Sequence, residues 1–337
     1  MSTEPRLLRM AGFFMEAPCD EAVVSEPAET VVYSLFLTSE EDPKVVANKP
    51  KMTRPTVYQF KLGEFTITNI LEGFLHRDDM HPVTATNGTA AEVEAIAKAH
   101  KLPFPQMEHQ FIPTLVDTGD KLIAFDPGFG DKNPSQGHYN GRLADAGYDL
   151  NDVDYVVVTH CHPDHIGNLT AGGNPTFPNA EIVFGEAEFA FWKKGENIPA
   201  HRPPTLEMFN NVCLPFEDQA RYVNPGDDIV SGVTAVDAFG HSAGHMAYHI
   251  ESNGQQLMIM SDTVAHFAIS PANPEWHFGM DDDPVKAVES RKRVLATVAD
   301  DEMLAIGFHM PFPSVGYMER HGDGYVWVPH SYQMNLA

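Results

Sequence analysis

The sequence is poor in cysteine and in basic residues, and it has no long apolar run. Its 337 residues include three cysteines, Cys19, Cys161 and Cys213, and this odd number at wide spacing excludes a disulfide framework. Lysine and arginine together number 22 against 47 acidic residues, which gives a net charge of −25. Such a chain lacks the basic face that nucleic-acid binding requires, and anionic membranes repel it. No stretch approaches the roughly 20 consecutive apolar residues of a membrane span.

The chain does have enough apolar material for a large core, and its two ends differ in composition. Hydrophobic residues make up 43% of the sequence, which suits one large α/β domain. Residues 1–55 are rich in Glu, Pro and small residues. We expect an N-terminal extension there, whose segment Val31–Leu37 adds an edge strand or contacts the partner subunit of a homodimer. The start, Met1–Phe14, is too short and interrupted for a secretory signal, so a cytoplasmic location is expected.

Local patterns predict strands and helices of a mixed α/β fold. A hairpin is predicted over 58–75, with its turn at Gly63. Thr89 and Glu92 have the spacing of a capping box, so a helix is expected to begin there. Asp283 before Pro284 gives an N-cap and a first-turn proline for another helix. Further elements are a hairpin over 111–125 and helices near 141–146, 186–194 and 204–212.

The most informative stretch places three histidines and an aspartate within six residues, directly after the apolar run Tyr155–Val158. A run of that kind predicts a buried strand, so these side chains stand where a strand ends and a loop begins. Histidines at positions i and i+2 can point to the same side of an extended segment. His160 and His162 could therefore serve one metal ion, and Asp164 with His165 a second. The cysteine between the first two histidines would point the other way and fill space.

More ligands are needed, because a catalytic zinc ion takes three protein ligands and keeps one position for water. Three further candidates stand at the exits of strand-like segments, where ligand sites concentrate in layered α/β folds. They are His241 after 232–236, Asp262 after 257–261, and His309 at the end of 304–309.

Taken together, HxHxDH, GHSAGH, Ser-Asp and a strand-end histidine resemble the dinuclear metallo-β-lactamase superfamily, from about Tyr58 to Pro329. The segments Phe60–Thr68, Val116–Leu122 and Gly322–Pro329 are similar to its methyl parathion hydrolase-like branch. The resemblance implies an α/β fold, a four-layer αβ/βα sandwich with the site at one edge of two packed sheets. Residues 56–337 would form this catalytic domain.

The resemblance also implies a role for each candidate ligand. Asp262 would bridge two divalent metal ions, because a carboxylate has two oxygens and a charge that offsets their repulsion. Zinc is the default ion, although imidazole also accommodates manganese, iron and cobalt. Asp126 and His245 are expected behind the ligands, and Asp164 and Asp262 are expected to be catalytic as well as ligating. The first metal would take His160, His162 and His241, and the second Asp164, His165 and His309.

The expected reaction is hydrolysis of a neutral ester, namely an aryl ester, a phosphotriester or a lactone, by a hydroxide held between the metals. Phe189, Trp192 and Phe308 are expected to line an apolar pocket for this small molecule. An acyl-homoserine lactonase is the alternative. Many such lactonases carry a tyrosine three residues after the bridging aspartate, where this chain has Ala265. A glyoxalase II-like thioesterase is further away, since the chain lacks a helical, basic tail.

Overall fold

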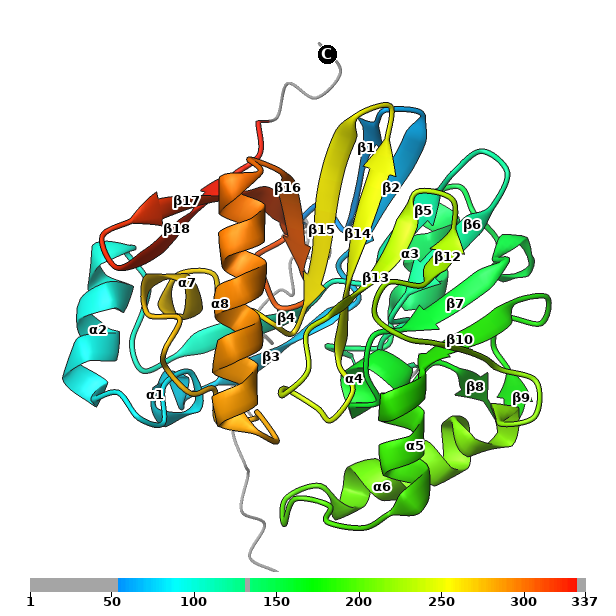
Figure 1. The fold of residues 1–337 in the computed structure, drawn as a ribbon, viewed down its shortest axis with the longest axis horizontal. Coiled ribbons are helices and arrows are strands. Elements are labelled where there is room, and N and C mark those ends of the chain that lie inside the picture. The colour runs from blue at the N-terminus through cyan, green and yellow to red at the C-terminus, as the bar shows by residue number, and fades with distance from the viewer. Residues whose placement is uncertain (1–53, 131–133, 332–337) are drawn as a thin grey trace, which may run out of the picture. The chain divides into compact units, whose positions relative to one another are not determined.

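The computed structural model describes residues 54–130 and 134–331 (Figure 1). Most of the expected N-terminal extension, including Val31–Leu37, lies outside the described residues. Its predicted edge strand and dimer contact therefore remain predictions. Within the described part of the chain, no helix is long and apolar enough to cross a membrane.

The described residues build two seven-stranded mixed sheets. In the first sheet, β6, β7, β10 and β11 run parallel and the remaining pairs are antiparallel. Its order is β1 (Val57–Leu62), β2 (Phe65–Ile70), β5 (Thr114–Asp117), β6 (Leu122–Phe125), β7 (Tyr155–Val158), β10 (Glu181–Gly185) and β11 (Arg221–Val223).

The second sheet is antiparallel except where β15 pairs with β16. Its order is β12 (Asp228–Val230), β13 (Val233–Asp237), β14 (Met246–Ser252), β15 (Gln255–Ser261), β16 (Leu304–Gly307), β17 (Val315–His321) and β18 (Gly324–Pro329). Two small two-stranded sheets add β3 (Gly73–Arg77) with β4 (Met107–Phe111), and β8 (Thr170–Ala171) with β9 (Asn174–Pro175).

Helices cover the outer faces of both large sheets, so the predicted four-layer αβ/βα sandwich is confirmed (Figure 1). The first sheet carries α3 (Tyr139–Asp145), α5 (Glu186–Lys194) and α6 (Pro203–Val212), and the second carries α8 (Pro284–Asp300). The shorter helices are α1 (Met80–Val83), α4 (Pro163–Ile166) and α7 (Ile269–Ala272), and α2 (Ala90–Ala99) packs against α7. Single turns of 3-10 helix are η1 (Leu150–Asp152) and η2 (Leu214–Phe216).

The local signals in the sequence explain where several elements begin. The first hairpin turns at Gly63, whose φ of 57° lies in the left-handed region that glycine adopts without strain. Thr89 and Glu92 form the predicted capping box of α2. Asp283 caps α8 by accepting a hydrogen bond from the backbone N–H of Lys286. The two caps satisfy backbone N–H groups that a helix end would otherwise leave unpaired.

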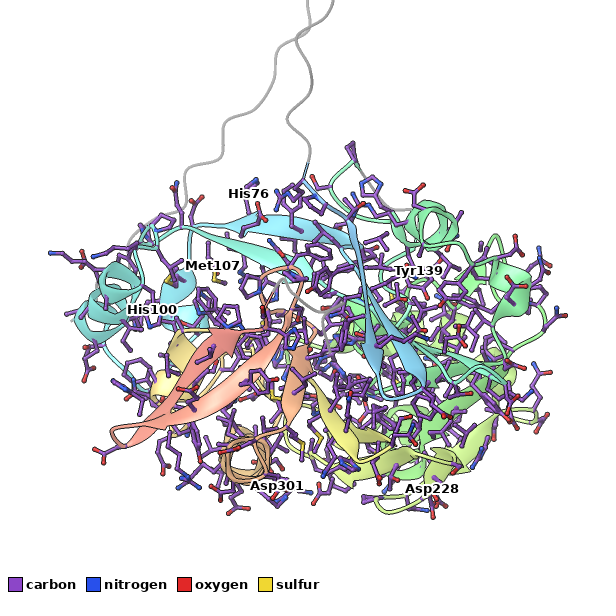
Figure 2. The ribbon with its side chains drawn as sticks, turned by 90° about the horizontal axis from the view of Figure 1, so that it is seen from above. His76, His100, Met107, Tyr139, Asp228 and Asp301 are labelled. Atoms are coloured by element: carbon purple, nitrogen blue, oxygen red, sulfur yellow. The ribbon has the colours of Figure 1, made fainter. Side chains whose placement is uncertain are left out.

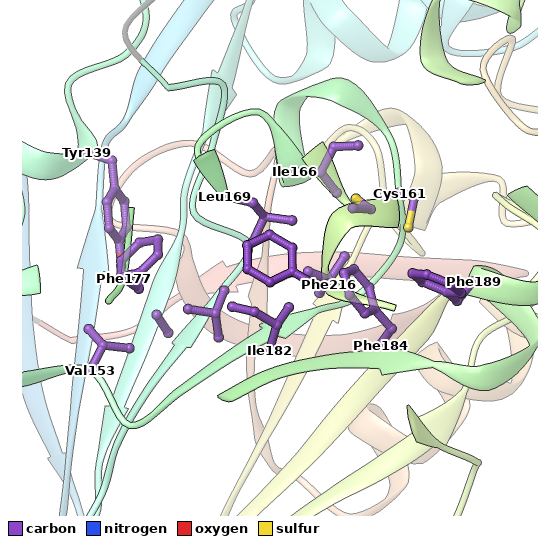
Figure 3. Close-up of a cluster of buried hydrophobic side chains, with 14 of the residues drawn as sticks. Tyr139, Val153, Cys161, Ile166, Leu169, Phe177, Ile182, Phe184, Phe189 and Phe216 are labelled. Carbon is purple, nitrogen blue, oxygen red and sulfur yellow. The ribbon is translucent and has the colours of Figure 1, made fainter. Parts of the chain in front are cut away.

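The two apolar clusters with the most buried residues join three of the four layers. One lies between the sheets and combines residues such as Val157 of the first sheet with Tyr248 and Ile259 of the second. The other lies between the first sheet and its helices, and Figure 3 shows Phe189 and Cys161 within it. The cysteine is fully buried there, as the sequence predicted. Because the sheets are fixed face to face, the ends of β7, β13, β15 and β16 can deliver side chains to one site.

Candidate metal centre

Three buried imidazoles, His160, His162 and His241, form what we call the first cluster. The first two follow β7, and His241 follows β13 of the other sheet. His160 Nε2 lies 2.9 Å from His162 Nδ1, which lies 3.0 Å from His241 Nε2. Three ring nitrogens from two sheets therefore converge on one point.

The second cluster consists of Asp164, His165, Asp262 and His309. Asp164 and His165 lie in α4, Asp262 directly follows β15, and His309 follows β16. His165 Nε2 is 3.4 Å from both Asp164 Oδ2 and Asp262 Oδ1. His309 Nε2 is 3.4 Å from Asp164 Oδ2 and 3.0 Å from Asp262 Oδ2. Two carboxylates and two imidazoles thus face one another in this second group.

Asp262 lies between the two clusters. Its Oδ2 is 3.2 Å from His241 Nε2 of the first cluster and 3.0 Å from His309 Nε2 of the second. Its Oδ1 faces His165. The side chain is 3% exposed, so its charge is compensated by groups within the protein rather than by water.

The spacing of these donor atoms fits a pair of metal ions. Zinc–nitrogen distances of about 2.0–2.1 Å place the donors of a tetrahedral ion about 3.3 Å apart. The donor atoms of each cluster all lie within 4.8 Å of one another, and the shortest separation is 2.9 Å. His165 Nε2 and Asp262 Oδ1 are buried and have no hydrogen-bond partner among the described residues. Since buried polar atoms are otherwise paired, a cation accepting both lone pairs would satisfy them.

The histidines of the site differ in their electrostatics. Burial opposes a positive charge on His241, yet its contacts with Asp262 and Asp281 raise its pKa to about 9. Burial opposes a positive charge on His165, yet Asp164, Asp262 and Asp126 raise its pKa well above the usual range. The second cluster is therefore a place that attracts a cation. Burial, helped by the charge of Arg202, lowers the pKa of His162 in the first cluster to about 3. That ring is neutral and keeps a lone pair for a metal.

Asp126 and His245, which were expected behind the ligands, are both buried at the site. Asp126 Oδ2 lies 3.0 Å from His165 Nδ1. The same carboxylate accepts hydrogen bonds from the backbone N–H and the hydroxyl of Thr159, at 2.8 and 2.7 Å. His245 Nε2 accepts a 3.3 Å hydrogen bond from the backbone N–H of Asp262. Contacts of this kind set the orientation of a ligand from the side away from the metal.

Sequence reasoning missed Asp281, which lies behind His241. Its Oδ1 accepts a 2.9 Å hydrogen bond from His241 Nδ1, and its Oδ2 accepts one of 3.0 Å from Arg291 Nη2. The neighbouring Asp282 lies 3.6 Å from His162 Nε2. The only signal in the sequence was a run of three aspartates before α8, which we interpreted as a helix cap alone.

Glu188 of α5 is the second residue that sequence reasoning missed. This buried carboxylate accepts four hydrogen bonds, two at each oxygen. Oε1 receives the backbone N–H of Cys161 at 2.9 Å and the indole N–H of Trp192 at 2.7 Å. Oε2 receives the hydroxyl of Ser242 and the backbone N–H of Gly244, both at 2.7 Å. One side chain therefore ties the loop of His160 and His162 to the loop of His241.

A cavity of about 290 Å³ opens beside both clusters. Side chains of both clusters form its floor, and the hairpin β3–β4 forms one wall. The polar lining outside the two clusters comes from Arg77, His109, His201, Arg202 and Thr205. The apolar lining comes from Leu75, Val83, Met107, Phe111, Phe129, Pro163, Phe278 and Met280.

The three aromatic residues that we expected in the pocket wall do not line this cavity. Trp192 and Phe189 are 0% and 3% exposed and belong to the apolar cluster under α5. The helix turns them inward together with Glu188, whose carboxylate engages the indole. Phe308 is also buried, and its ring packs 4.0 Å from that of His165. The aromatic residues that do line the cavity are Phe111, Phe129 and Phe278.

Known proteins have similar structures. AidC, a dizinc quorum-quenching lactonase in complex with a product, aligns with a TM-score of 0.77 at 26% identity, over 82% of this chain and 98% of that one. The hydrolase AbOPH of the beta lactamase superfamily aligns with a TM-score of 0.78 at 26% identity, over 84% of this chain and all of that one. Both alignments extend over most of the described residues.

Sequence comparison gives a consistent result over a shorter length. The N-acyl homoserine lactonase of Bacillus thuringiensis is 25% identical over 169 residues, half of this chain, and the chain spans 60% of that relative's length. The family model of the metallo-beta-lactamase superfamily matches residues 113–309, more than half of the chain. That range contains every residue of both clusters. The chain belongs to the metallo-β-lactamase superfamily.

Proposed function

We propose that this protein opens lactone rings, with N-acyl homoserine lactones as the substrate class. The observation that carries the proposal is the pair of clusters joined by Asp262 at the floor of a small cavity. The likeness to AidC over most of both chains supports it, and so do the lactonases among the curated relatives. This was the alternative in the sequence analysis, and it now takes first place.

The residues present fit two divalent ions, and we assign zinc because imidazole and carboxylate donors at these spacings suit it. His160, His162 and His241 would hold one ion, Asp164, His165 and His309 the other, and Asp262 both. When bound, the ions supply Lewis-acid charge that polarises the ester carbonyl and makes water nucleophilic at neutral pH.

The protein's own groups bind and orient the ester. The negative charge of Asp262 lies between the clusters and offsets the repulsion between two cations. Apolar side chains such as Phe129 and Phe278 shield the cavity from bulk water, which strengthens every electrostatic interaction inside it. The arginines of the wall already carry counter-charges, since Arg77 pairs with Asp79 and Arg202 with Asp282. A neutral substrate therefore meets no unpaired charge in the wall.

The size of the cavity restricts the substrate further. About 290 Å³ is at the lower end of the range of about 300–1,000 Å³ that is typical of small-molecule sites. A lactone ring with a short acyl chain fits such a volume, whereas a long chain must extend beyond it. We therefore expect short acyl chains to be preferred over long ones.

The second candidate keeps two of the three substrate classes that the sequence analysis placed first, neutral aryl esters and phosphotriesters, hydrolysed by a member of the methyl parathion hydrolase-like branch. One observation favours it. Ala265 stands where many lactonases of the superfamily carry a tyrosine, and it is 2% exposed without a polar group. The same charged centre attacks carbonyl and phosphoryl groups alike, so the cavity must discriminate between them.

A substrate panel distinguishes the candidates. Short- and long-chain acyl-homoserine lactones, an aryl acetate, a dialkyl aryl phosphotriester, a glutathione thioester and a β-lactam should be compared by kcat/KM on the metal-loaded protein. We expect the short-chain lactone to rank first, the aryl ester second, and the thioester and β-lactam to show little turnover. A chelator should abolish all activity, and metal analysis should give about two ions per chain.

Two results would contradict the proposal. An aryl ester or phosphotriester that exceeds every lactone would restore the second candidate and leave the metal site intact. A dominant thioesterase activity would refute both, because a chain of net charge −25 is expected to repel an anionic glutathione conjugate. One metal ion or none in protein never exposed to chelator would refute the dinuclear assignment itself.

A further inference from the structure

The hairpin β3–β4 presents one face to the cavity and the other to solvent. Alternate residues of a strand point to the same side, and Met107, His109 and Phe111 of β4 all line the cavity. In the neighbouring strand, His76 is exposed and lies on the opposite side from Met107 (Figure 2). The cavity face of this hairpin therefore carries one imidazole that belongs to neither metal cluster, His109.

His109 lies directly against the second cluster. Its ring stacks on that of His309 with 3.9 Å between centroids and 25° between planes, and it meets the edge of Phe111 at 5.7 Å. Within residues 54–130 and 134–331, no group forms a hydrogen bond with either of its ring nitrogens. Neither nitrogen is among the fully buried unpaired atoms. The imidazole therefore keeps its hydrogen-bonding capacity for something that enters the cavity.

The two arginines of the cavity wall are already engaged. Arg77 forms two hydrogen bonds with Asp79, at 2.9 and 2.8 Å. Arg202 donates to Asp282 at 2.9 Å and to the backbone oxygen of Met280. Neither arginine has a ring contact with a member of a metal cluster, as His109 does. The position of a free donor beside His309 distinguishes this histidine from both.

We propose that His109 donates a hydrogen bond from its ring N–H to the leaving oxygen of the ester, beside the second cluster. The inference rests on the proposed function and names a substrate-contacting residue for it. An imidazole offers an N–H donor whether it is neutral or protonated, so this role needs no change of charge. Negative charge develops on the leaving oxygen as its bond to the carbonyl carbon breaks, and a fixed donor stabilises that charge most at the transition state.

The test asks how far a substitution of His109 lowers kcat for substrates with different leaving groups. His109→Phe keeps a ring that can stack on His309 and removes the donor, whereas His109→Gln restores a donor. For the lactone, whose leaving group is an aliphatic alkoxide, His109→Phe should lower kcat about 100-fold. For a phenyl ester the loss should be less than about fivefold, because phenols have a pKa near 10 and their anions need less stabilisation. His109→Gln should recover part of the activity on the lactone.

A second readout does not depend on turnover. The ring-opened N-acyl homoserine presents a hydroxyl where the leaving oxygen was, so His109→Phe should weaken its binding about tenfold by calorimetry. Metal content should stay at the wild-type value in all variants. His76→Phe is the matched control, since it makes the same change on the solvent face of the same hairpin and should alter none of these quantities.

Equal losses on the lactone and the phenyl ester, or loss of metal in His109→Phe, would overturn the proposal and make His109 a support of His309. An unchanged kcat would overturn it as well. If wild-type protein cleaves no lactone, the proposed function fails by itself. The ethyl and phenyl esters of one acid then test His109 in the same way, because they differ only in the leaving group.

Discussion

The two metal clusters are built from different donors, although both take residues from both sheets. The first cluster has three imidazoles and no carboxylate of its own, whereas the second has two imidazoles, Asp164 and Asp262. Neutral donors compensate none of an ion's charge, and carboxylates compensate most of it. The first cluster therefore depends on a group that it shares, since Asp262 Oδ2 lies 3.2 Å from His241 Nε2.

The clusters also differ in what holds their loops in place. In the second cluster, main-chain contacts hold the loop of His309. His309 Nδ1 bonds the backbone oxygen of Gln110 at 2.9 Å, and the N–H of Phe308 donates to the oxygen of Ser261. In the first cluster, the loops are joined by one buried side chain, Glu188. Substitution of Glu188 should therefore disturb the first cluster more than the second.

The largest effect is expected at the residue that both clusters share. Asp262→Asn keeps the shape but removes the charge that lies between the two sites. We expect metal content to fall from about two ions per chain, and turnover to fall together with it by more than about 100-fold. Metal analysis and kcat/KM on the best substrate measure the two quantities.

Cys161→Ser is the control for that change, because the thiol lies in the apolar cluster rather than among the ligands. It should leave metal content and turnover near the wild-type values. If Cys161→Ser removed metal while Asp262→Asn did not, the assignment of ligands would be wrong.

A smaller and more selective effect is expected at Glu188. Glu188→Gln puts an amide N–H where an oxygen now accepts two hydrogen bonds, so at least one buried donor loses its partner. The free energy of unfolding should fall by about 1–3 kcal/mol. Metal affinity should fall about 10–100-fold for one of the two ions, as for other residues that orient ligands from behind. Chemical denaturation and competition with a metal-binding dye would measure the two effects.

Trp192→Phe is the matched control, since it removes one of the four donors to Glu188 and keeps an aromatic ring beside His162. It should cost about 1 kcal/mol of stability and leave metal affinity and substrate preference unchanged. A change in preference between large and small substrates would instead restore Trp192 to the pocket wall. Equal loss of both metals in Glu188→Gln would remove the contrast between the clusters.

The sequence predicted most of the fold and the cluster residues because their signals are local or periodic. His160, His162, Asp164 and His165 lie within six residues, and apolar runs predict the strands that precede the other ligands. Hairpins and helix caps depend on residues a few positions apart, such as Thr89 and its partner in the capping box. Interactions of that range can be inferred without knowing the tertiary structure.

Residues that act only through tertiary contacts were missed or misplaced. Glu188 bonds Gly244, 56 positions away, and Asp281 bonds His241, 40 positions away. Nothing in the local pattern around either acidic residue indicates these partners. Trp192 was misplaced for a related reason. An aromatic residue on a helix near the site suits a pocket wall and a core equally, and the direction in which α5 faces decides between them.

The smallest effect is expected at Asp283, the N-cap of α8. This prediction distinguishes the role of the helix cap from that of Asp281, which supports the first cluster. Asp283 and Asp281 lie two residues apart, but only Asp281 bonds a cluster histidine, while Asp283 caps the helix at Lys286. Asp283→Ala should therefore lower the free energy of unfolding by about 1 kcal/mol, and Asp283→Asn, which can still cap, by less. Both variants should keep the metal content and kcat of the wild type, because the Asp283 N–H still donates to the oxygen of Gly240 and holds the segment in place. Loss of one metal ion in Asp283→Ala would show that the first cluster depends on the helix cap as well as on the carboxylate behind His241.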